Sequence, residues 1–244
     1  MNPWNVVNSG RPITFEEGPV PEAALPAWRS VLAVVAHPDD ESFALGALLA
    51  SFARGGADVS VLCLTRGEAS TLHGVAGDLL ELRAAELSAA ANVLGLREVE
   101  LLTFPDGGLS EVDLGRLAAH VIDSAQRVGA DGIIGFDVNG VTGHADHARA
   151  TAAAIEAAEA CDLPVLGWTV PDGVAGRLRA EHGAPFEGYA DEAIDLVVPV
   201  ERSVQLAAVA CHRSQAVPGS VMWRRLELLG DHEHLRWLRQ PTAA

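Results

Sequence analysis

The chain has 244 residues, 17 basic and 33 acidic, with a formal net charge of −16 and a pI near 4.8. Lysine is absent, and no cluster of arginines forms a phosphate-binding stripe, which argues against nucleic acid as a partner. No apolar run is long enough to span a membrane, and the N-terminus lacks the charged-then-apolar order of a signal peptide. We therefore expect a cytoplasmic protein without a membrane span.

Apolar runs bounded by turn residues predict six strands, at 31–36, 58–64, 98–103, 131–136, 164–170 and 194–200. Helices are predicted at 42–55, 78–95, 111–128, 145–160 and 201–212, with shorter ones at 221–229 and 232–238. Strands separated by helices favour right-handed crossovers. The expected fold is therefore α/β and Rossmann-like, with a mostly parallel sheet covered by helices on both faces.

Residues 1–244 are predicted to form a single α/β domain, because the length suits one well-buried core and no linker interrupts the pattern. The first 27 residues differ in composition. They contain five prolines, Pro3, Pro12, Pro19, Pro21 and Pro26, which favour an extended arm over a folded unit.

The run from Val31 to Glu41 is the most informative stretch. Its six apolar residues predict a buried strand that ends on a histidine, a proline and three consecutive acids. Unpaired buried carboxylates are costly, so a cation held where the strand stops explains the cluster. His37 and Asp40 are close enough to bind one ion, and Asp39 would remain free to act on a water. The alternative is that Asp39 or Asp40 only caps the following helix.

A second polar cluster follows the strand at 131–136. His144 and His147 open an alanine-rich helix, with Asp146 between them. Positions three apart on a helix share a face, so both histidines can point into one cleft. Alternatively, Asp146 interacts with the helix dipole and the histidines are surface residues. Since a parallel sheet gathers its strand-to-helix turns along one edge, we expect the two clusters to lie together.

The string A-H-P-D-D-E at 36–41, together with H-x-D-H at 144–147, resembles the LmbE/PIG-L family of zinc-dependent N-deacetylases. Members of this family remove acetyl groups from N-acetylglucosamine conjugates. Weaker matches spread the resemblance over most of the chain: T-R-G-E at 65–68, R-x-x-E at 83–86, P-D-G at 105–107 and H-R-S-Q at 212–215. One departure is Ala145, where several members carry proline at a position that bears no ligand.

The resemblance implies an LmbE-like fold and one Zn²⁺ per chain, bound by His37, Asp40 and His147. Fe²⁺ or another divalent ion is an alternative. Two imidazoles and one carboxylate leave coordination positions open, which is typical of catalytic rather than structural zinc. The resemblance also implies that Asp39 is the general base and that His144, as an imidazolium, stabilises the tetrahedral oxyanion.

Four further residues receive expected roles at this edge of the sheet. Asp146 is expected to orient His144 or to raise its pKa. Arg66 and Asp106 end the second and third predicted strands, and His212 opens the H-R-S-Q motif. These last three are candidates for contact with the substrate, against the alternatives of an ordinary ion pair, a turn carboxylate and a structural histidine.

The expected function is hydrolysis of the N-acetyl group of a small acetylated aminosugar conjugate. An amidase of a thiol-sugar conjugate would use the same site. Non-haem Fe(II) oxygenases share the ligand set, but they are built on all-β barrels, whereas this chain alternates strands and helices. A non-catalytic sugar-binding module would leave the acids and histidines without a shared purpose. Assembly into a homo-oligomer remains open.

Overall fold

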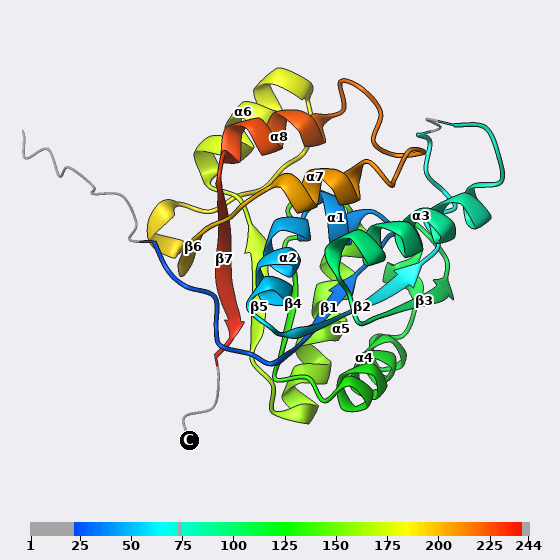
Figure 1. Cartoon of the computed structure of the whole chain (residues 1–244), viewed down its shortest axis with the longest axis vertical. Coiled ribbons are helices and arrows are strands. Elements are labelled where there is room, and N and C mark those ends of the chain that lie inside the picture. Colours follow the sequence, from blue (N-terminus) through cyan, green and yellow to red (C-terminus); the bar gives the residue numbers. More distant parts are fainter. Residues whose placement is uncertain (1–21, 73–74, 241–244) are drawn as a thin grey trace, which may run out of the picture.

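A seven-stranded sheet forms the centre of the molecule (Figure 1). The computed structural model describes residues 22–72 and 75–240. The strands are β1 (Ser30–Val35), β2 (Asp58–Thr65), β3 (Glu98–Phe104), β4 (Gly132–Phe136), β5 (Val165–Thr169), β6 (Leu196–Pro199) and β7 (His232–Arg239). Their order is β3-β2-β1-β4-β5-β7-β6, and β1 to β5 are mutually parallel. The predicted α/β class with a mostly parallel sheet is confirmed.

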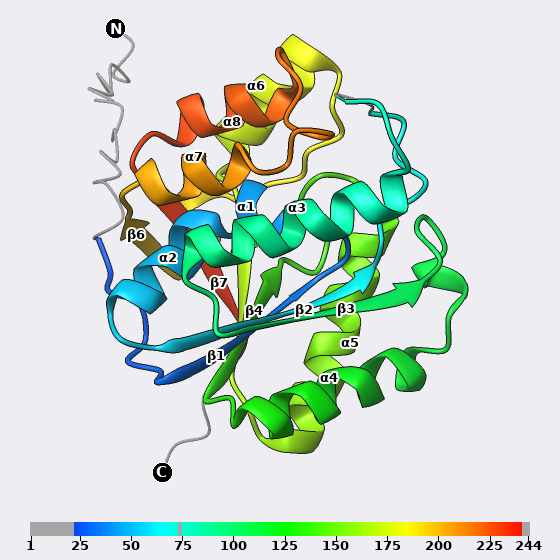
Figure 2. The same ribbon diagram turned by 45° about the vertical axis from the view of Figure 1, so that its right-hand side comes forward.

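Helices cover both faces of this sheet, as predicted. They are α1 (Asp40–Phe43), α2 (Gly46–Arg54), α3 (Leu79–Leu94), α4 (Leu114–Val128), α5 (Ala145–Cys161), α6 (Asp172–His182), α7 (Ser203–Val209) and α8 (Val221–Leu229). Figure 2 shows α4 and α5 on one face, with α2, α3 and α7 on the other. The two faces bury separate apolar clusters, which is why the central strands are apolar on both sides.

Local sequence signals set the ends of several helices. Asp78 and Asp113 cap α3 and α4, each accepting a backbone N–H of the first turn. Gly95 and Gly129 end the same helices with φ of 71° and 62°, a left-handed conformation that glycine adopts without steric cost. These helices therefore begin and end close to the predicted boundaries.

The segment 232–238 was predicted as a helix, and that prediction is wrong. It forms β7, which pairs antiparallel with both β5 and β6. Glu233 and Leu235 are buried while His232 and His234 are half-buried, so burial alternates with the period of a strand. A run of this length fits both the helical and the strand period of burial. The hydrogen bonds of this segment to β5 on one side and β6 on the other make it a strand. The sequence also failed to predict α6, which contains two glycines that weaken its helix propensity.

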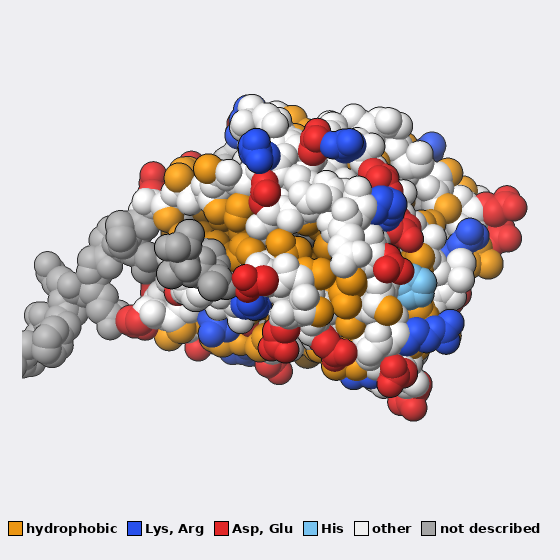
Figure 3. Space-filling view, turned by 90° about the horizontal axis from the view of Figure 1, so that it is seen from below, with side chains coloured by type: hydrophobic (Ala, Val, Ile, Leu, Met, Phe, Trp, Pro, Cys, Tyr) orange, Lys and Arg blue, Asp and Glu red, His pale blue; other side chains and the backbone are white. Residues whose placement is uncertain are grey.

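The predicted Pro-rich arm at 1–27 lies mostly outside the residues that the structure describes, so it stays a prediction. Within residues 22–72 and 75–240, no helix has the length and apolar character needed to cross a membrane. Figure 3 shows one face of the molecule on which acidic and basic side chains are interspersed, without a positive stripe.

The clusters predicted at the edge of the sheet follow β1 and β4, which are adjacent. The chain leaves β1 for β2 on one side and returns to β4 on the other, so a topological switch point lies between them. In open α/β sheets the crevice at this point is where ligands bind.

The buried Asp137 ties β4 to the antiparallel strand β7. Its carboxylate lies 3.0 and 3.1 Å from Nη1 of Arg236 and accepts a hydrogen bond from the Tyr189 hydroxyl at 2.9 Å. Removing a buried ion-pair partner costs about 3 kcal/mol or more, because the other charge loses its compensation.

We expect Asp137→Ala to lower the free energy of unfolding by about 3 kcal/mol, whereas Tyr189→Phe lowers it by about 1 kcal/mol. Urea denaturation of both variants and the wild type measures this difference. Equal losses in the two variants would show that the ion pair adds nothing beyond a single hydrogen bond.

Candidate active site

Asp39 occupies a strained position at the turn between β1 and α1. Its φ is 144°, which is costly for a residue with a Cβ atom. Two contacts hold it there: its N–H donates to Oε2 of Glu41 at 3.0 Å, and its carboxylate lies 3.0 Å from Nη2 of Arg83. The Asp39 side chain makes no capping hydrogen bond to α1 and lines a cavity instead. The capping alternative therefore fails for this residue.

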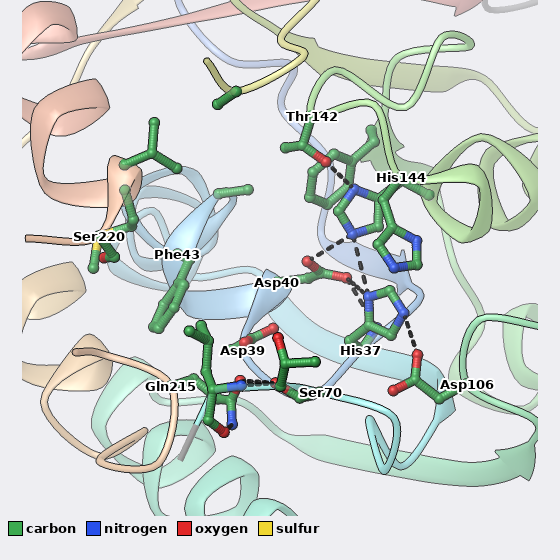
Figure 4. Close-up of a pocket in the computed structure, with 18 of the residues that line it drawn as sticks. His37, Asp39, Asp40, Phe43, Ser70, Asp106, Thr142, His144, Gln215 and Ser220 are labelled. Atoms are coloured by element: carbon green, nitrogen blue, oxygen red, sulfur yellow. Dashed lines mark hydrogen bonds and ion pairs between the residues drawn. The ribbon is translucent and has the colours of Figure 1, made fainter. Parts of the chain in front are cut away.

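His37, Asp40 and His147 come together as the two motifs predicted. Nδ1 of His37 lies 3.2 Å from Nε2 of His147, which is in turn 3.2 Å from the Asp40 carboxylate. The third distance, from Nδ1 of His37 to the Asp40 carboxylate, is 3.6 Å. Figure 4 shows His37 and Asp40 pointing toward one another at the centre of the site.

These distances fit a tetrahedral metal ion. With metal–ligand bonds of about 2.0–2.1 Å, two ligands of a tetrahedral zinc are about 3.3 Å apart. Other sets of metal-binding groups overlap this one, namely His37 with His144 and His147, and His37 with Asp106 and Asp146. The partners of His37 and His147 indicate which of these three sets points its ligand atoms at one ion.

Nδ1 of His37 and Nε2 of His147 face the same point, where each presents a lone pair once it is deprotonated. Nδ1 of His147 lies 2.8 Å from the Thr142 hydroxyl and 3.2 Å from the Gly140 carbonyl. The carbonyl can only accept and the hydroxyl can accept as well, which favours a proton on this nitrogen and a free Nε2. Nε2 of His37 faces the carboxylates of Asp106 at 3.0 Å and Asp146 at 3.4 Å, which leaves Nδ1 free. Second-shell acceptors of this kind orient metal-binding histidines in general. The geometry therefore favours His37, Asp40 and His147 as the ligands.

Burial and neighbouring charges shift the pKa values of these groups in opposite directions. Burial alone would lower the pKa of His37, but the carboxylates of Asp106, Asp146 and Asp40 raise it well above its usual value. Burial alone would raise the pKa of Asp40, but His147 and His37 hold it well below its usual value. The carboxylates of Asp40, Asp106 and Asp146 thus concentrate negative charge around His37, which favours a cation at this position.

Asp39 differs from its neighbour Asp40. Burial raises its pKa to about 6, with Arg83 opposing this shift and the charge of Asp40 adding to it. A carboxyl group with a pKa close to neutrality can both take up and release a proton at the pH of the cell. The two adjacent aspartates therefore have different electrostatic environments.

His144 lies at the N-terminus of α5, exposed beside the metal-binding groups, with its ring 4.5 Å from that of His37. Its Nδ1 accepts a hydrogen bond from the Asp146 N–H at 3.2 Å, which requires an unprotonated nitrogen. Burial and the nearby His37 and His147 lower the pKa of His144. Both observations favour a neutral ring with its proton on Nε2, rather than the imidazolium that was expected.

Asp146 contacts His144 only through its backbone N–H. Its carboxylate instead accepts hydrogen bonds from the N–H groups of Gly107 and Leu109, at 2.8 and 3.1 Å, and faces His37. Asp146 therefore holds the loop after β3 against His37. Its charge raises the pKa of His144, but burial and the charges of His37 and His147 lower that pKa by more.

The three predicted substrate contacts have different environments. Asp106 lines the cavity and accepts a hydrogen bond from the Ala69 N–H at 2.8 Å. Arg66 is half-buried and does not line the cavity. His212 is fully buried, with Nε2 2.7 Å from Oε1 of Glu41. The structure thus places His212 behind the turn that carries Asp39 and not in the cavity itself.

Several residues of the site carried no assigned role from the sequence. Arg83, besides its contact with Asp39, donates to the carbonyls of Pro38 and Gly67 at 2.6 and 2.7 Å. Glu86 accepts hydrogen bonds from the N–H and hydroxyl of Ser214, at 2.8 and 2.6 Å. The signal available in the sequence was a pair of opposite charges, three residues apart, on the apolar face of a predicted helix.

The cavity has a volume of about 550 Å³, within the range of small-molecule sites. The metal-binding groups, Asp39 and His144 line one end. The remaining walls combine polar side chains with apolar ones, which include Ser70, Thr71, Gln215, Phe43, Phe136, Phe186 and Met222. Ser70 and Gln215 hydrogen-bond each other at 2.7 Å. A ligand of sugar size, with both polar and apolar faces, matches this lining.

Residues 32–158 match the family described as GlcNAc-PI de-N-acetylase, PIG-L. The chain is 34% identical over 195 residues to 1D-myo-inositol 2-acetamido-2-deoxy-alpha-D-glucopyranoside deacetylase 1 of Catenulispora acidiphila. That match covers 70% of this chain and 57% of the relative, so the chain spans little more than half of the relative's length. The deacetylase of the same name from Mycobacterium sp. strain JLS is 32% identical over 235 residues, covering 78% of this chain and 74% of the relative.

Solved structures share the fold at lower sequence identity. The zinc-inhibited form of the teicoplanin deacetylase Orf2 matches with a TM-score of 0.64 and 20% identity, over 88% of this chain and all of that chain. The 4-carboxy-2-hydroxymuconate hydratase GalB of Pseudomonas putida matches with a TM-score of 0.66 and 19% identity, over 88% of this chain and 98% of that one. One is a deacetylase and the other a hydratase, so the fold alone does not select the reaction.

The family is established by the sequence matches rather than by the fold. The matched segment contains both motifs, at 36–41 and 144–147, and covers more than half of the chain. The family expected from these motifs is confirmed: the chain belongs to the PIG-L family of GlcNAc-PI de-N-acetylases.

Proposed function

We propose that this protein is a zinc-dependent N-deacetylase that removes the acetyl group from an N-acetylglucosamine-type conjugate. The observation that carries the proposal is the position of Asp39, a partly buried carboxylate with a pKa of about 6 that lines the same cavity as His37, Asp40 and His147. A proton acceptor next to metal-binding groups is the arrangement that hydrolysis of an amide requires.

Nδ1 of His37, the carboxylate of Asp40 and Nε2 of His147 would hold the metal. A bound zinc supplies Lewis acidity, which activates a water and polarises the acyl oxygen. The tautomers of both histidines are set by Gly140 and by the carboxylates around His37, so the ligands are oriented before the ion binds.

Asp39 is the general base of the proposed reaction. It takes a proton from the attacking water and delivers it to the nitrogen of the leaving amine. Arg83 and Glu41 fix its side chain and backbone, so little reorganisation is needed when the water is deprotonated. His212 supports the same turn from behind, through Glu41.

His144 donates a hydrogen bond from Nε2 to the developing oxyanion, as a neutral ring. Its Nδ1 is occupied by the Asp146 N–H, which also fixes the orientation of the imidazole. A preorganised donor of this kind acts mainly in the transition state.

The substrate class is supported by the relatives that the chain matches, which are named as deacetylases of an N-acetylated glucosamine conjugate. An amidase of a thiol-sugar conjugate would use the same residues and is the second candidate. An Fe(II) oxygenase is disfavoured, because the ligands follow strands of an α/β sheet. The direct test is a fluorescamine assay of amines released by the zinc-loaded protein, on N-acetyl sugars and on conjugates with longer acyl groups.

The first prediction concerns the metal. We expect one zinc per chain in the purified protein, and none in the variant with alanine at His37, Asp40 and His147. His147→Ala alone should lose the metal, whereas His144→Ala retains it, because only His147 has a free nitrogen directed at Asp40. Elemental analysis by mass spectrometry decides this. Loss of zinc from both single variants would instead support the ligand set that contains His144.

The second prediction separates the adjacent aspartates. Asp39→Asn should retain zinc and lose about 10²–10⁴-fold in kcat, as removal of a general base does. Asp40→Asn should lower zinc occupancy. Asp39 must be ionised to accept a proton, so wild-type activity should fall as the pH drops through the pKa of Asp39. That pKa is about 6 without a metal, and a bound cation lowers it. The residual activity of Asp39→Asn should lack this acidic limb, and equal zinc loss in both variants would reject the division of roles.

The third prediction tests the protonation state of His144. His144→Ala should lower kcat by about 10²–10³-fold with little change in KM, as loss of one oxyanion donor does. His144→Gln, which keeps a neutral donor, should recover part of this loss. The alkaline limb of the pH profile should be the same in the wild type and in His144→Gln. Disappearance of that limb in both variants would show that His144 acts as an imidazolium.

A further inference from the structure

The end of the cavity formed by α8 carries a second set of polar groups that the proposed reaction does not use. Ser220 and Arg225 line this end, together with Phe43, Val221 and Met222. Figure 4 shows Ser220 and Phe43 on the side of the pocket away from Asp106 and His37. A substrate whose acetamide group lies at His37 therefore extends its remaining part toward α8.

Arg225 is a buried cation without a carboxylate partner. Only 4% of its surface is exposed, and no carboxylate of the described residues lies within ion-pair distance of its guanidinium. Nη2 donates to the Phe43 carbonyl, the guanidinium lies 4.9 Å from the centre of the Trp168 ring, and Nε has no hydrogen-bond acceptor. An unpaired buried charge is costly, which a negatively charged ligand would offset.

The charges of the buried Glu233 and Asp40 raise the pKa of Arg225, but neither carboxylate forms an ion pair with it. Glu233 accepts hydrogen bonds from Arg202 at 2.6 Å and from Nε1 of Trp168 at 2.7 Å, so its oxygens already have partners. Burial lowers the pKa of Arg225 to about 10, a value at which the guanidinium remains protonated at neutral pH.

Ser220 adds an independent observation at the same end of the cavity. It is the N-cap residue of the nine-residue helix α8, but its hydroxyl makes no capping hydrogen bond. That hydroxyl oxygen is buried and has no hydrogen-bond partner. The first N–H groups of a helix also lack intrahelical acceptors, and the helix dipole favours an anion there.

We propose that Arg225, Ser220 and the N-terminus of α8 form a subsite for a carboxylate group on the part of the substrate beyond the acetylated sugar. This inference rests on the proposed function. The acidic end of the cavity, with Asp39, Asp40 and Asp106, repels a second negative charge, so an anionic group is directed to α8.

The charges at this subsite favour a carboxylate over a phosphate monoester. One guanidinium and one helix terminus supply little more than a single positive charge, whereas a phosphate monoester carries nearly two negative charges at neutral pH. The planar guanidinium matches the two oxygens of a carboxylate. The apolar neighbours Phe43 and Met222 also favour the ion with the lower charge.

The test compares matched conjugates of N-acetylglucosamine that end in a carboxylate, a carboxamide or a phosphate monoester, each at two linker lengths. The zinc-loaded wild type should have a kcat/KM about 10- to 100-fold higher for the carboxylate than for the carboxamide, as expected for a charge-assisted hydrogen bond. The phosphate should be the poorer of the two anions. Equal rates for carboxylate and carboxamide at both linker lengths, or preference for the phosphate, would overturn the proposal.

Variants then locate the preference. Arg225→Gln should reduce the ratio of kcat/KM for the carboxylate to kcat/KM for the carboxamide to near one. Ser220→Ala should reduce the same ratio by about 2- to 10-fold. Ser220→Ala also provides the test if Arg225→Gln fails to fold. The matched control is Arg224→Gln, because Arg224 is the neighbouring residue of α8, pairs with Glu181 and Glu227, and does not line the cavity. An unchanged ratio in both Arg225→Gln and Ser220→Ala would place the anion elsewhere.

Calorimetry on the zinc-loaded Asp39→Asn variant separates this inference from the proposed function. Tighter binding of the carboxylate than of the carboxamide, without amine release by the wild type, would support the subsite and reject the deacetylase. Amine release from all conjugates at equal rates would support the deacetylase and reject the subsite.

Discussion

The site depends on the cost of burying the Asp40 carboxylate between two imidazoles. Asp40, His37 and His147 are each less than a tenth exposed, and their polar atoms lie 3.2–3.6 Å apart. In the interior such groups cannot be left as unscreened charges. Acceptors surround the cluster, Gly140 at His147 and the carboxylates of Asp106 and Asp146 at His37, and the cluster could hold a cation that offsets the charge.

The turn after β1 is strained at the same place. Asp39 and Asp40 both line the cavity, and the backbone at Asp39 takes an unusual conformation. The φ of 144° at Asp39 is maintained by Glu41 and Arg83, which are themselves buried. The strain is therefore supported by one residue close in the chain, Glu41, and one distant residue, Arg83, and backbone strain held in this way is characteristic of functional sites.

These supporting residues connect the edge of the sheet to the C-terminal half of the chain. His212 contacts Glu41 and Ser214 contacts Glu86, both behind the cavity, whereas Gln215 of the same H-R-S-Q motif lies in the cavity wall. The cavity is consequently asymmetric in charge: the acids and imidazoles gather at one end and Arg225 lies at the other.

The sequence by itself determined the α/β class, the positions of β1 to β5, the two motifs at adjacent strand ends and the family. Each of these follows from local periodicity or from short motifs, in which the informative residues lie within a few positions of one another. Even the pairing of His37 with His147 could be expected, because parallel strands bring their carboxyl ends to one edge.

Only the tertiary structure decided the rest, because the deciding contacts join residues far apart in the chain. The segment of β7 was predicted as a helix and becomes a strand through pairing with β5 and β6. Arg83 meets Pro38 across 45 positions, His212 meets Glu41 across 171, and Arg225 meets Phe43 across 182. The lowered pKa of His144 likewise follows from neighbours that its own motif does not specify, since a pKa depends on burial and on every charge nearby.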